Sequence, residues 1–188
     1  MAEELKDQNV AILVADGFEQ VELTEPRRVL EEAGARTHVI SPGRNKVKGW
    51  NHKDWGDEMA VDVPLDRADA GQYQALLLPG GVMNPDKLRR NPAALSFVKA
   101  FFDRRKPVAV ICHGAWTLID AGVVEGRRLT SYPSLQTDLK NAGAQWVDEQ
   151  VVVDEGLVSS RKPDDLPAFN QAMLDVFSKQ GGQVSSAA

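Results

Sequence analysis

The chain has 188 residues, of which 43% are hydrophobic and 26% are charged, as in an ordinary globular protein. Its net charge of −5 gives no attraction to nucleic acid or anionic lipid, and no apolar run approaches the roughly 18 residues that a membrane span needs. The charged N-terminus has no signal-peptide core, and the one cysteine excludes an intramolecular disulfide. We therefore expect a cytoplasmic protein with no membrane contact, and nucleic acid is an unlikely stable partner.

Short apolar runs alternate with helical stretches, which predicts an α/β fold whose mostly parallel sheet is covered on both faces. The strands are expected at residues 9–15, 37–40, 60–63, 75–78 and 107–111, with shorter ones near 129–131, 150–153 and 157–160. No linker or repeat interrupts this order, so residues 1–188 should form a single domain. Its core should span about residues 9–179, with a flexible tail over residues 180–188.

The first helix should present Leu23, Val29 and Leu30 on its apolar face, hold Pro26 in its first turn and end near Gly34. Further helices are expected at residues 92–105, 115–121, 135–141 and 165–179.

Residues 44–57 are largely polar and contain Trp50 and Trp55. This pattern predicts a surface loop or a short hairpin, and the tryptophans suggest an interface or a pocket rim.

Cys112 lies where a buried strand runs straight into a turn and a helix, the layout of a nucleophile elbow. Such a turn exposes the side chain at the carboxyl end of the sheet, and Gly114 lets the backbone fold back without a Cβ clash. The positive end of the following helix should lower the pKa of the thiol. The alternative is that Cys112 is a buried apolar residue without chemistry.

His113 follows the cysteine and could serve as a base, although adjacent side chains usually diverge and a third group would have to orient it. The alternative is a surface histidine whose main-chain N–H matters more than its ring.

Two loops should converge on the sulfur. Gly80 and Gly81 end a neighbouring strand and can turn N–H groups toward an oxyanion, with the N–H of His113 as the second donor. Glu19 and Glu22 follow the first strand, and a buried, protonated carboxyl there could donate a hydrogen bond to a thiolate. Taken alone, the glycines could be only a turn and the acids only solvated helix-start residues.

Several segments together resemble the PfpI (intracellular protease I) branch of the ThiJ/PfpI superfamily, which is class I glutamine amidotransferase-like. They are ADGFEQVE at 15–22, LPGG at 78–81, AVICHG at 109–114 and VVVD at 151–154, extended by TSYP at 130–133, NAG at 141–143, LVSSR at 157–161 and PDDLP at 163–167. The resemblance covers residues 9–177 in order, and it implies a flavodoxin-like three-layer α/β/α sandwich.

The resemblance also implies a nucleophile at Cys112 with Glu22 as its acidic neighbour, or Glu19 if the loop aligns differently. In this branch an acid after the glycines reaches the histidine of the next subunit, and Asp86 is at the matching position. Asp86 is shorter than the usual glutamate and its loop is one residue longer, which weakens a Cys112–His113–Asp86 triad. A homo-oligomer, either a dimer or a hexamer, is implied as well.

Three functions fit these residues. The first is a stress-response, cysteine-dependent hydrolase of reactive carbonyls or glycated adducts, of deglycase or glyoxalase type. The second is an intracellular cysteine peptidase, and the third is a non-enzymatic redox sensor that works through oxidation of Cys112. We expect no cofactor and no metal, because three scattered histidines and one cysteine make no ligand set; His38 and His52 should be structural or solvent-exposed.

Overall fold

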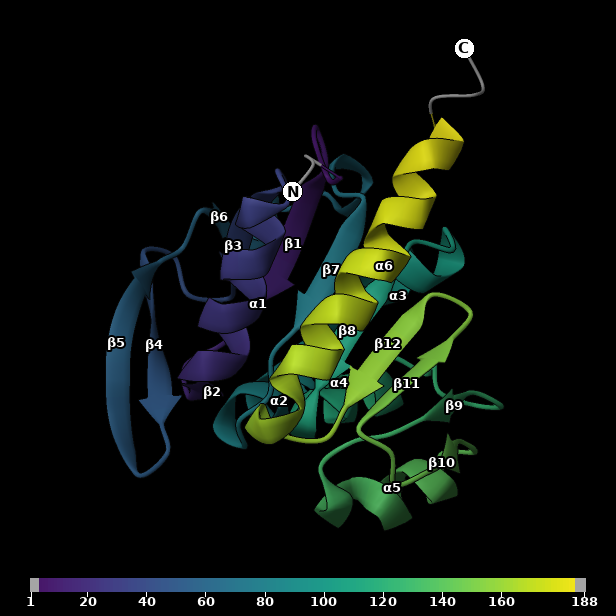
Figure 1. Ribbon diagram of the computed structural model, residues 1–188. Coiled ribbons are helices and arrows are strands. Elements are labelled where there is room, and N and C mark those ends of the chain that lie inside the picture. The colour runs from purple at the N-terminus through teal and green to yellow at the C-terminus, as the bar shows by residue number, and fades with distance from the viewer. Residues whose placement is uncertain (1–3, 185–188) are drawn as a thin grey trace.

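The computed structural model describes residues 4–184, including the side chains of residues 4–179. Its centre is a seven-stranded sheet with the order β11-β12-β8-β7-β1-β3-β6 (Figure 1). Every neighbouring pair is parallel except β11 and β12. The strands are β1 (Asn9–Leu13), β3 (Arg36–Ser41), β6 (Val63–Pro64), β7 (Ala75–Leu78), β8 (Val108–Ile111), β11 (Val151–Asp154) and β12 (Leu157–Ser160).

Helices cover both faces of this sheet, so the flavodoxin-like three-layer α/β/α sandwich is confirmed (Figure 1). α1 and α6 lie on one face, and α3 and α4 lie on the other. The helices are α1 (Gln20–Glu32), α2 (Met83–Leu88), α3 (Pro92–Asp103), α4 (Ala115–Asp120), α5 (Gln136–Asn141) and α6 (Leu166–Val184). Short 3-10 turns are η1 (Leu65–Arg67), η2 (Ala70–Gln72), η3 (Cys112–Gly114), η4 (Pro133–Leu135) and η5 (Pro163–Asp165).

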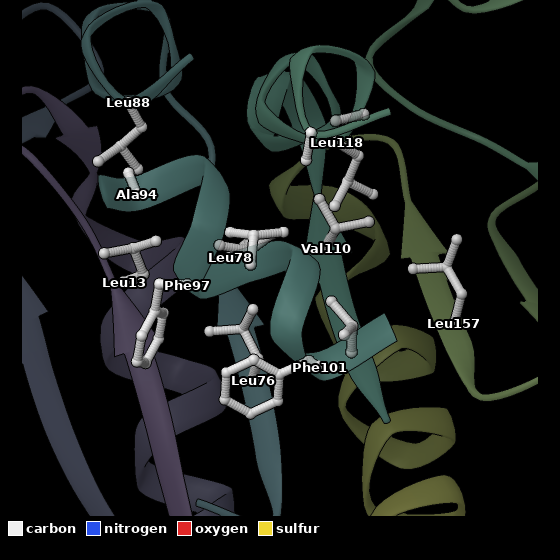
Figure 2. Packing of buried hydrophobic residues seen from close by; sticks show 14 of the residues in the cluster. Leu13, Leu76, Leu78, Leu88, Ala94, Phe97, Phe101, Val110, Leu118 and Leu157 are labelled. Carbon is white, nitrogen blue, oxygen red and sulfur yellow. The ribbon is translucent and has the colours of Figure 1, made fainter. Parts of the chain in front are cut away.

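Alternation along the central strands divides the buried side chains into two cores, because successive residues of a strand point to opposite faces. Leu76 and Leu78 of β7 pack with Phe97 and Phe101 of α3 on one face (Figure 2). Leu77, between them, belongs to the opposite core together with residues of α1 and α6. Burial on both faces accounts for the continuous apolar sequence of these strands.

Two small sheets flank the domain. β9 (Arg128–Leu129) pairs with β10 (Gln145–Trp146). β2 (Phe18–Glu19) pairs in parallel with β4 (Lys46–Asn51), which forms an antiparallel hairpin with β5 (Asp54–Ala60). The predicted hairpin in the polar segment 44–57 is therefore confirmed.

Some predicted boundaries are wrong. Pro26 lies inside α1 and not in its first turn, because the helix begins at Gln20, directly after β2. Since proline has no N–H, the carbonyl of Glu22 lacks the usual partner four residues on. α6 continues past Lys179 to Val184, so residues 180–184 of the predicted tail belong to this helix, and residues 185–188 lie outside the part described.

No single strand occupies residues 60–63. β5 ends at Ala60 and β6 begins at Val63, while Val61 donates to the carbonyl of Asn45 and Asp62 to that of Val39. The segment therefore crosses from the hairpin to the central sheet. Between residues 4 and 184, no helix is long and apolar enough to cross a membrane.

Candidate active site

The predicted site residues other than Asp86 gather at the carboxyl ends of β1, β7 and β8, three adjacent strands. β3 lies on one side of β1 and β7 lies on the other, so the direction in which strands are added to the sheet reverses at β1. Open α/β sheets bind ligands at such a reversal. Glu22 comes from the segment after β1, Gly80 from the loop after β7 and Cys112 from the turn after β8.

Cys112 adopts the strained backbone of a nucleophile elbow, with a φ of +62°. Its carbonyl accepts the N–H of Tyr132 at 3.1 Å, and the residue is only 7% exposed. A Cβ on Gly114 would lie 2.9 Å from the carbonyl oxygen of Leu78, which is why only glycine fits there. The hydrogen bond from Tyr132 and the close packing of Gly114 against Leu78 thus hold Cys112 at the turn.

The two predicted N–H donors, those of Gly81 and His113, both point at the sulfur of Cys112. They lower the pKa of the thiol, but burial raises it by more, and a negative charge on the Glu22 carboxyl would raise it further. The prediction that the helix end gives a low thiol pKa is therefore wrong for the free site. Cys112 can therefore ionise only if a neighbouring group accepts its proton or stabilises the sulfur anion with a hydrogen bond.

Glu22 is such a neighbour. Its side chain is fully buried, Oε2 accepts the N–H of Gly80 at 2.8 Å, and the carboxyl interacts with the Cys112 thiol. Burial raises the pKa of Glu22 to about 8, and the charge of Glu19 contributes in the same direction. Glu22 is thus mostly protonated at neutral pH. A proton on its carboxyl can be donated to a sulfur anion.

His113 turns its ring toward the sulfur, with Nδ1 3.1 Å from Sγ of Cys112. The expectation that the adjacent side chains diverge is wrong, because the left-handed turn at Cys112 brings them together. The ring stacks on Tyr132 with centroids 4.5 Å apart and meets Trp116 edge-on, while Nε2 lies 3.4 Å from Oγ of Ser134. Burial lowers the pKa of His113, so the ring is neutral at pH 7.

Gly80 and Gly81 allow a close approach that no other residue would permit. A Cβ on Gly80 would lie 2.5 Å from Oε2 of Glu22 and 2.6 Å from Cβ of Cys112. Gly81 has a φ of +77° and packs against the backbone of Gly17 and Glu19.

Asn84 holds this loop, and the sequence did not reveal it. Its side chain is fully buried; Oδ1 accepts the N–H of Ala15, and Nδ2 donates to the carbonyls of Pro79 and Gly80, each at 3.0 Å. One amide therefore ties the end of β1 to the loop after β7. Its position two residues before Asp86 in the sequence was the available signal.

Asp86 is not part of the site within one chain. It is exposed on α2, and its carboxyl makes no hydrogen bond or ion pair with any residue that the structure describes. The segment 83–88, treated as a loop in the sequence, is this helix. A contact between Asp86 and His113 would need a second copy of the chain.

A cavity of about 450 Å³ opens above the sulfur. Its lining includes Cys112, His113, Glu19, Glu22, Trp50 and Tyr132. His52 lines it as well, so the β4–β5 hairpin forms part of the pocket rim. Across residues 4–184, no group of three or more His, Cys, Asp or Glu side chains is arranged to hold a metal ion.

The raised pKa of Glu22 predicts a pH-dependent stability. In the unfolded chain Glu22 ionises above about pH 4.5, whereas in the folded protein it ionises only near pH 8. The contribution of the neutral acid to the free energy of unfolding is therefore full below pH 4.5. It is lost as the pH rises from 4.5 to 8. Glu22→Gln should therefore gain stability relative to the wild type between pH 4.5 and 8, by up to about 5 kcal/mol. Denaturant unfolding across this pH range measures the difference.

Glu25→Gln, an exposed change on the same helix, is the matched control and should stay within about 0.5 kcal/mol throughout. A Glu22→Gln difference that does not vary with pH would contradict a neutral Glu22.

Comparison with known proteins gives consistent matches. The model described as the DJ-1/PfpI family matches residues 8–176. General stress protein 18 of Bacillus subtilis is 42% identical over 174 residues, which cover 92% of this chain and 99% of that protein. Deglycase TK1284 of Thermococcus kodakarensis is 45% identical over 168 residues, covering 89% and 98%. The solved ThiJ/PfpI domain protein from Brachyspira murdochii superposes with a TM-score of 0.85 at 23% identity, covering 93% of this chain and 98% of that one.

Proposed function

Because this chain belongs to the DJ-1/PfpI family, we propose that it is a stress-response, cysteine-dependent hydrolase of reactive carbonyls or glycated adducts. The observation that carries the proposal is the convergence of a proton acceptor, a proton donor and two N–H groups on one sulfur. His113 Nδ1 lies 3.1 Å from Sγ, Glu22 is protonated beside it, and Gly81 and His113 direct N–H groups at it. The relatives named as a stress protein and as a deglycase support the same assignment.

The proposed reaction begins when His113 takes the thiol proton and the sulfur adds to an aldehyde carbon. The C–S bond forms, the π electrons of the carbonyl move to its oxygen, and the N–H groups and the Glu22 proton stabilise that oxygen. In an α-ketoaldehyde, a proton then moves from the sulfur-bearing carbon to its neighbour, which converts the first carbon to a thioester and leaves an alkoxide oxygen on the second. That oxygen takes the proton that His113 received from the thiol and becomes an alcohol. Water cleaves the thioester and releases a 2-hydroxy acid and the free thiol, so one water is consumed in each cycle.

The test is conversion of methylglyoxal to lactate by purified protein whose Cys112 is shown to be reduced by its intact mass. We expect multiple turnovers, and no turnover after the thiol is blocked with iodoacetamide. Lactate formation at equal rates by the blocked and free proteins, or by neither, would overturn the proposal.

The role of Glu22 predicts a shift of the thiol pKa, measured from the pH dependence of Cys112 alkylation. Glu22→Gln keeps a hydrogen-bond donor, whereas Glu22→Met fills similar space without one. Because a hydrogen bond to the charged form favours that form, the alkylation midpoint of Glu22→Met should lie about one to two pH units above that of Glu22→Gln. If both variants have lower midpoints than the wild type, native Glu22 is an anion and does not donate.

A cysteine peptidase is the second candidate, and the geometry favours it less. Cys112 is 7% exposed and lines a cavity of about 450 Å³, which suits a small carbonyl better than an extended polypeptide. In addition, no carboxylate of the described residues orients His113. If the protein hydrolyses a fluorogenic peptide and loses this activity when Cys112 is blocked, the peptidase becomes the better-supported function.

A further inference from the structure

Another cavity lies at the end of the central sheet opposite to Cys112. Its volume is about 410 Å³, and its lining includes Val108 and Leu157, the first residues of the parallel strands β8 and β12. Cys112 follows the last residue of β8, so the length of this strand separates the two cavities. They share no lining residue.

The lining of this cavity carries more positive than negative charge. Its cations are Arg105, Lys106 and Arg127. Its single acid is Glu155, and none of these four side chains forms an ion pair with any residue between 4 and 179. Burial lowers the pKa of Lys106, and the charge of the nearby Arg104 lowers it further, against a smaller opposite effect of Asp69. The positive charge at this end of the sheet is therefore not neutralised by the described part of the chain.

The guanidinium of Arg127 is positioned by the fold and still has unused donors. Nε donates to the carbonyl of Val123 at 3.0 Å, and Cζ lies 5.0 Å from the centroid of the Phe102 ring. The two terminal nitrogens make no hydrogen bond with any side chain or main chain of residues 4–179. A guanidinium held in this way can bind one oxyanion through two parallel N–H groups.

Arg105 and Lys106 contribute in different ways. Nζ of Lys106 donates to the carbonyls of Ala70 and Tyr73, so its donors are occupied and it supplies charge rather than a contact. Arg105 is exposed and has a φ of +53° in the turn after α3. Its guanidinium makes no hydrogen bond within the described chain, which leaves it available as a second donor.

We propose that this cavity binds a small molecule that carries a carboxylate or phosphate group, and that Arg127 and Arg105 hold this oxyanion. The apolar part of the ligand lies against the wall formed by Phe102, Val108 and Leu157. A cationic ligand would be repelled by three positive side chains, and a purely apolar one would keep the guanidinium donors from water without replacing their hydrogen bonds. The proposal does not rest on the function proposed for Cys112.

The binding experiment records amide NMR spectra while sodium phosphate replaces sodium chloride at constant pH and ionic strength. We expect a saturable shift of the Gly156 amide at millimolar phosphate, because Gly156 lines the cavity. A parallel titration with sodium propionate tests a carboxylate with an apolar tail, and the tighter binder identifies the oxyanion. Protein whose Cys112 is blocked with iodoacetamide should bind equally well, so the result is independent of turnover.

Four variants test the assigned residues. Arg127→Gln should weaken binding about tenfold or more, and Arg127→Lys, which keeps the charge without the planar fork, at least threefold. Arg105→Asn suits the left-handed backbone and should also weaken binding at least threefold. Glu155→Gln removes the only acid of the lining and should strengthen binding. Arg36→Gln changes an exposed arginine at the amino end of β3, outside the cavity, and is the matched control that should leave binding unchanged.

Three results would overturn the site. The first is that neither phosphate nor propionate shifts the Gly156 amide in a saturable way. The second is equal weakening by Arg36→Gln and Arg127→Gln, because the anions would then respond only to net charge. The third is weaker binding in Glu155→Gln, because the carboxylate and not the arginines would then form the contact.

Discussion

Cys112→Ser should lower kcat for methylglyoxal by about 10³-fold or more, with the fold intact. The reason is that a serine hydroxyl, whose pKa is far above that of a thiol, cannot be ionised by the neutral His113 ring at 3.1 Å. Every other group of the site remains, including the two N–H donors and Glu22, so the loss measures the sulfur itself. Steady-state turnover of both proteins at the same pH gives the ratio.

The fold control for this variant is its unfolding midpoint, which should stay within a few degrees because serine and cysteine are similar in size. Ser134→Ala, which removes only the hydroxyl 3.4 Å from Nε2 of His113, should lower kcat less than tenfold. If Cys112→Ser retains a tenth of the wild-type rate, the sulfur is not the nucleophile and the proposed reaction is wrong.

Gly81→Ala should destabilise the protein by about 3 kcal/mol or more and abolish turnover in the fraction that still folds. Gly81 has a φ of +77°, and an added Cβ would lie 2.5 Å from the carbonyl oxygen of Gly17 and 2.6 Å from the nitrogen of Glu19. Both neighbours are backbone atoms, so neither can rotate away. Relief of the clash would displace the N–H that points at Cys112.

Gly122→Ala separates the two causes, because Gly122 has a φ of +70° but nothing within 4 Å of an added Cβ. It should lose only about 1 kcal/mol, the usual effect of a left-handed alanine, and keep full activity. Denaturant unfolding and turnover of the two variants test the pair. Equal losses of stability would mean that backbone conformation, and not the close packing at Gly81, sets the requirement for glycine.

The central strands were predictable because their sequences are continuously apolar and end at residues that stop a strand. β7 and β12 begin and end at the predicted residues. α2 was missed because Pro85 and three polar residues give the segment 83–88 the look of a loop. Burial of Asn84 and Pro85 against the domain, which no local pattern records, makes it a helix.

The candidate site was predictable in its members but not in its electrostatics. The elbow motif identified Cys112, and the glycines and Glu22 follow from their positions at the ends of β7 and β1. The sign of the thiol pKa shift was wrong, because it depends on the extent of burial, which comes from packing of the whole domain. The contributions of Trp50 and His52 to the cavity required the hairpin to fold toward the site, and sequence spacing does not encode that direction.

The fixed arrangement around the sulfur also has a stereochemical consequence. In the proposed reaction the N–H groups of Gly81 and His113, which point at the sulfur, would bind the carbonyl oxygen in one place, and the carboxyl of Glu22 is enclosed by Gly80 and the surrounding core. The carbon next to the one bound to Cys112, which is planar until it receives its proton, therefore presents the same one of its two faces to the proton donor in every cycle. The new chiral centre of the product is then set by the protein and not by chance, so the 2-hydroxy acid should leave the site as a single enantiomer.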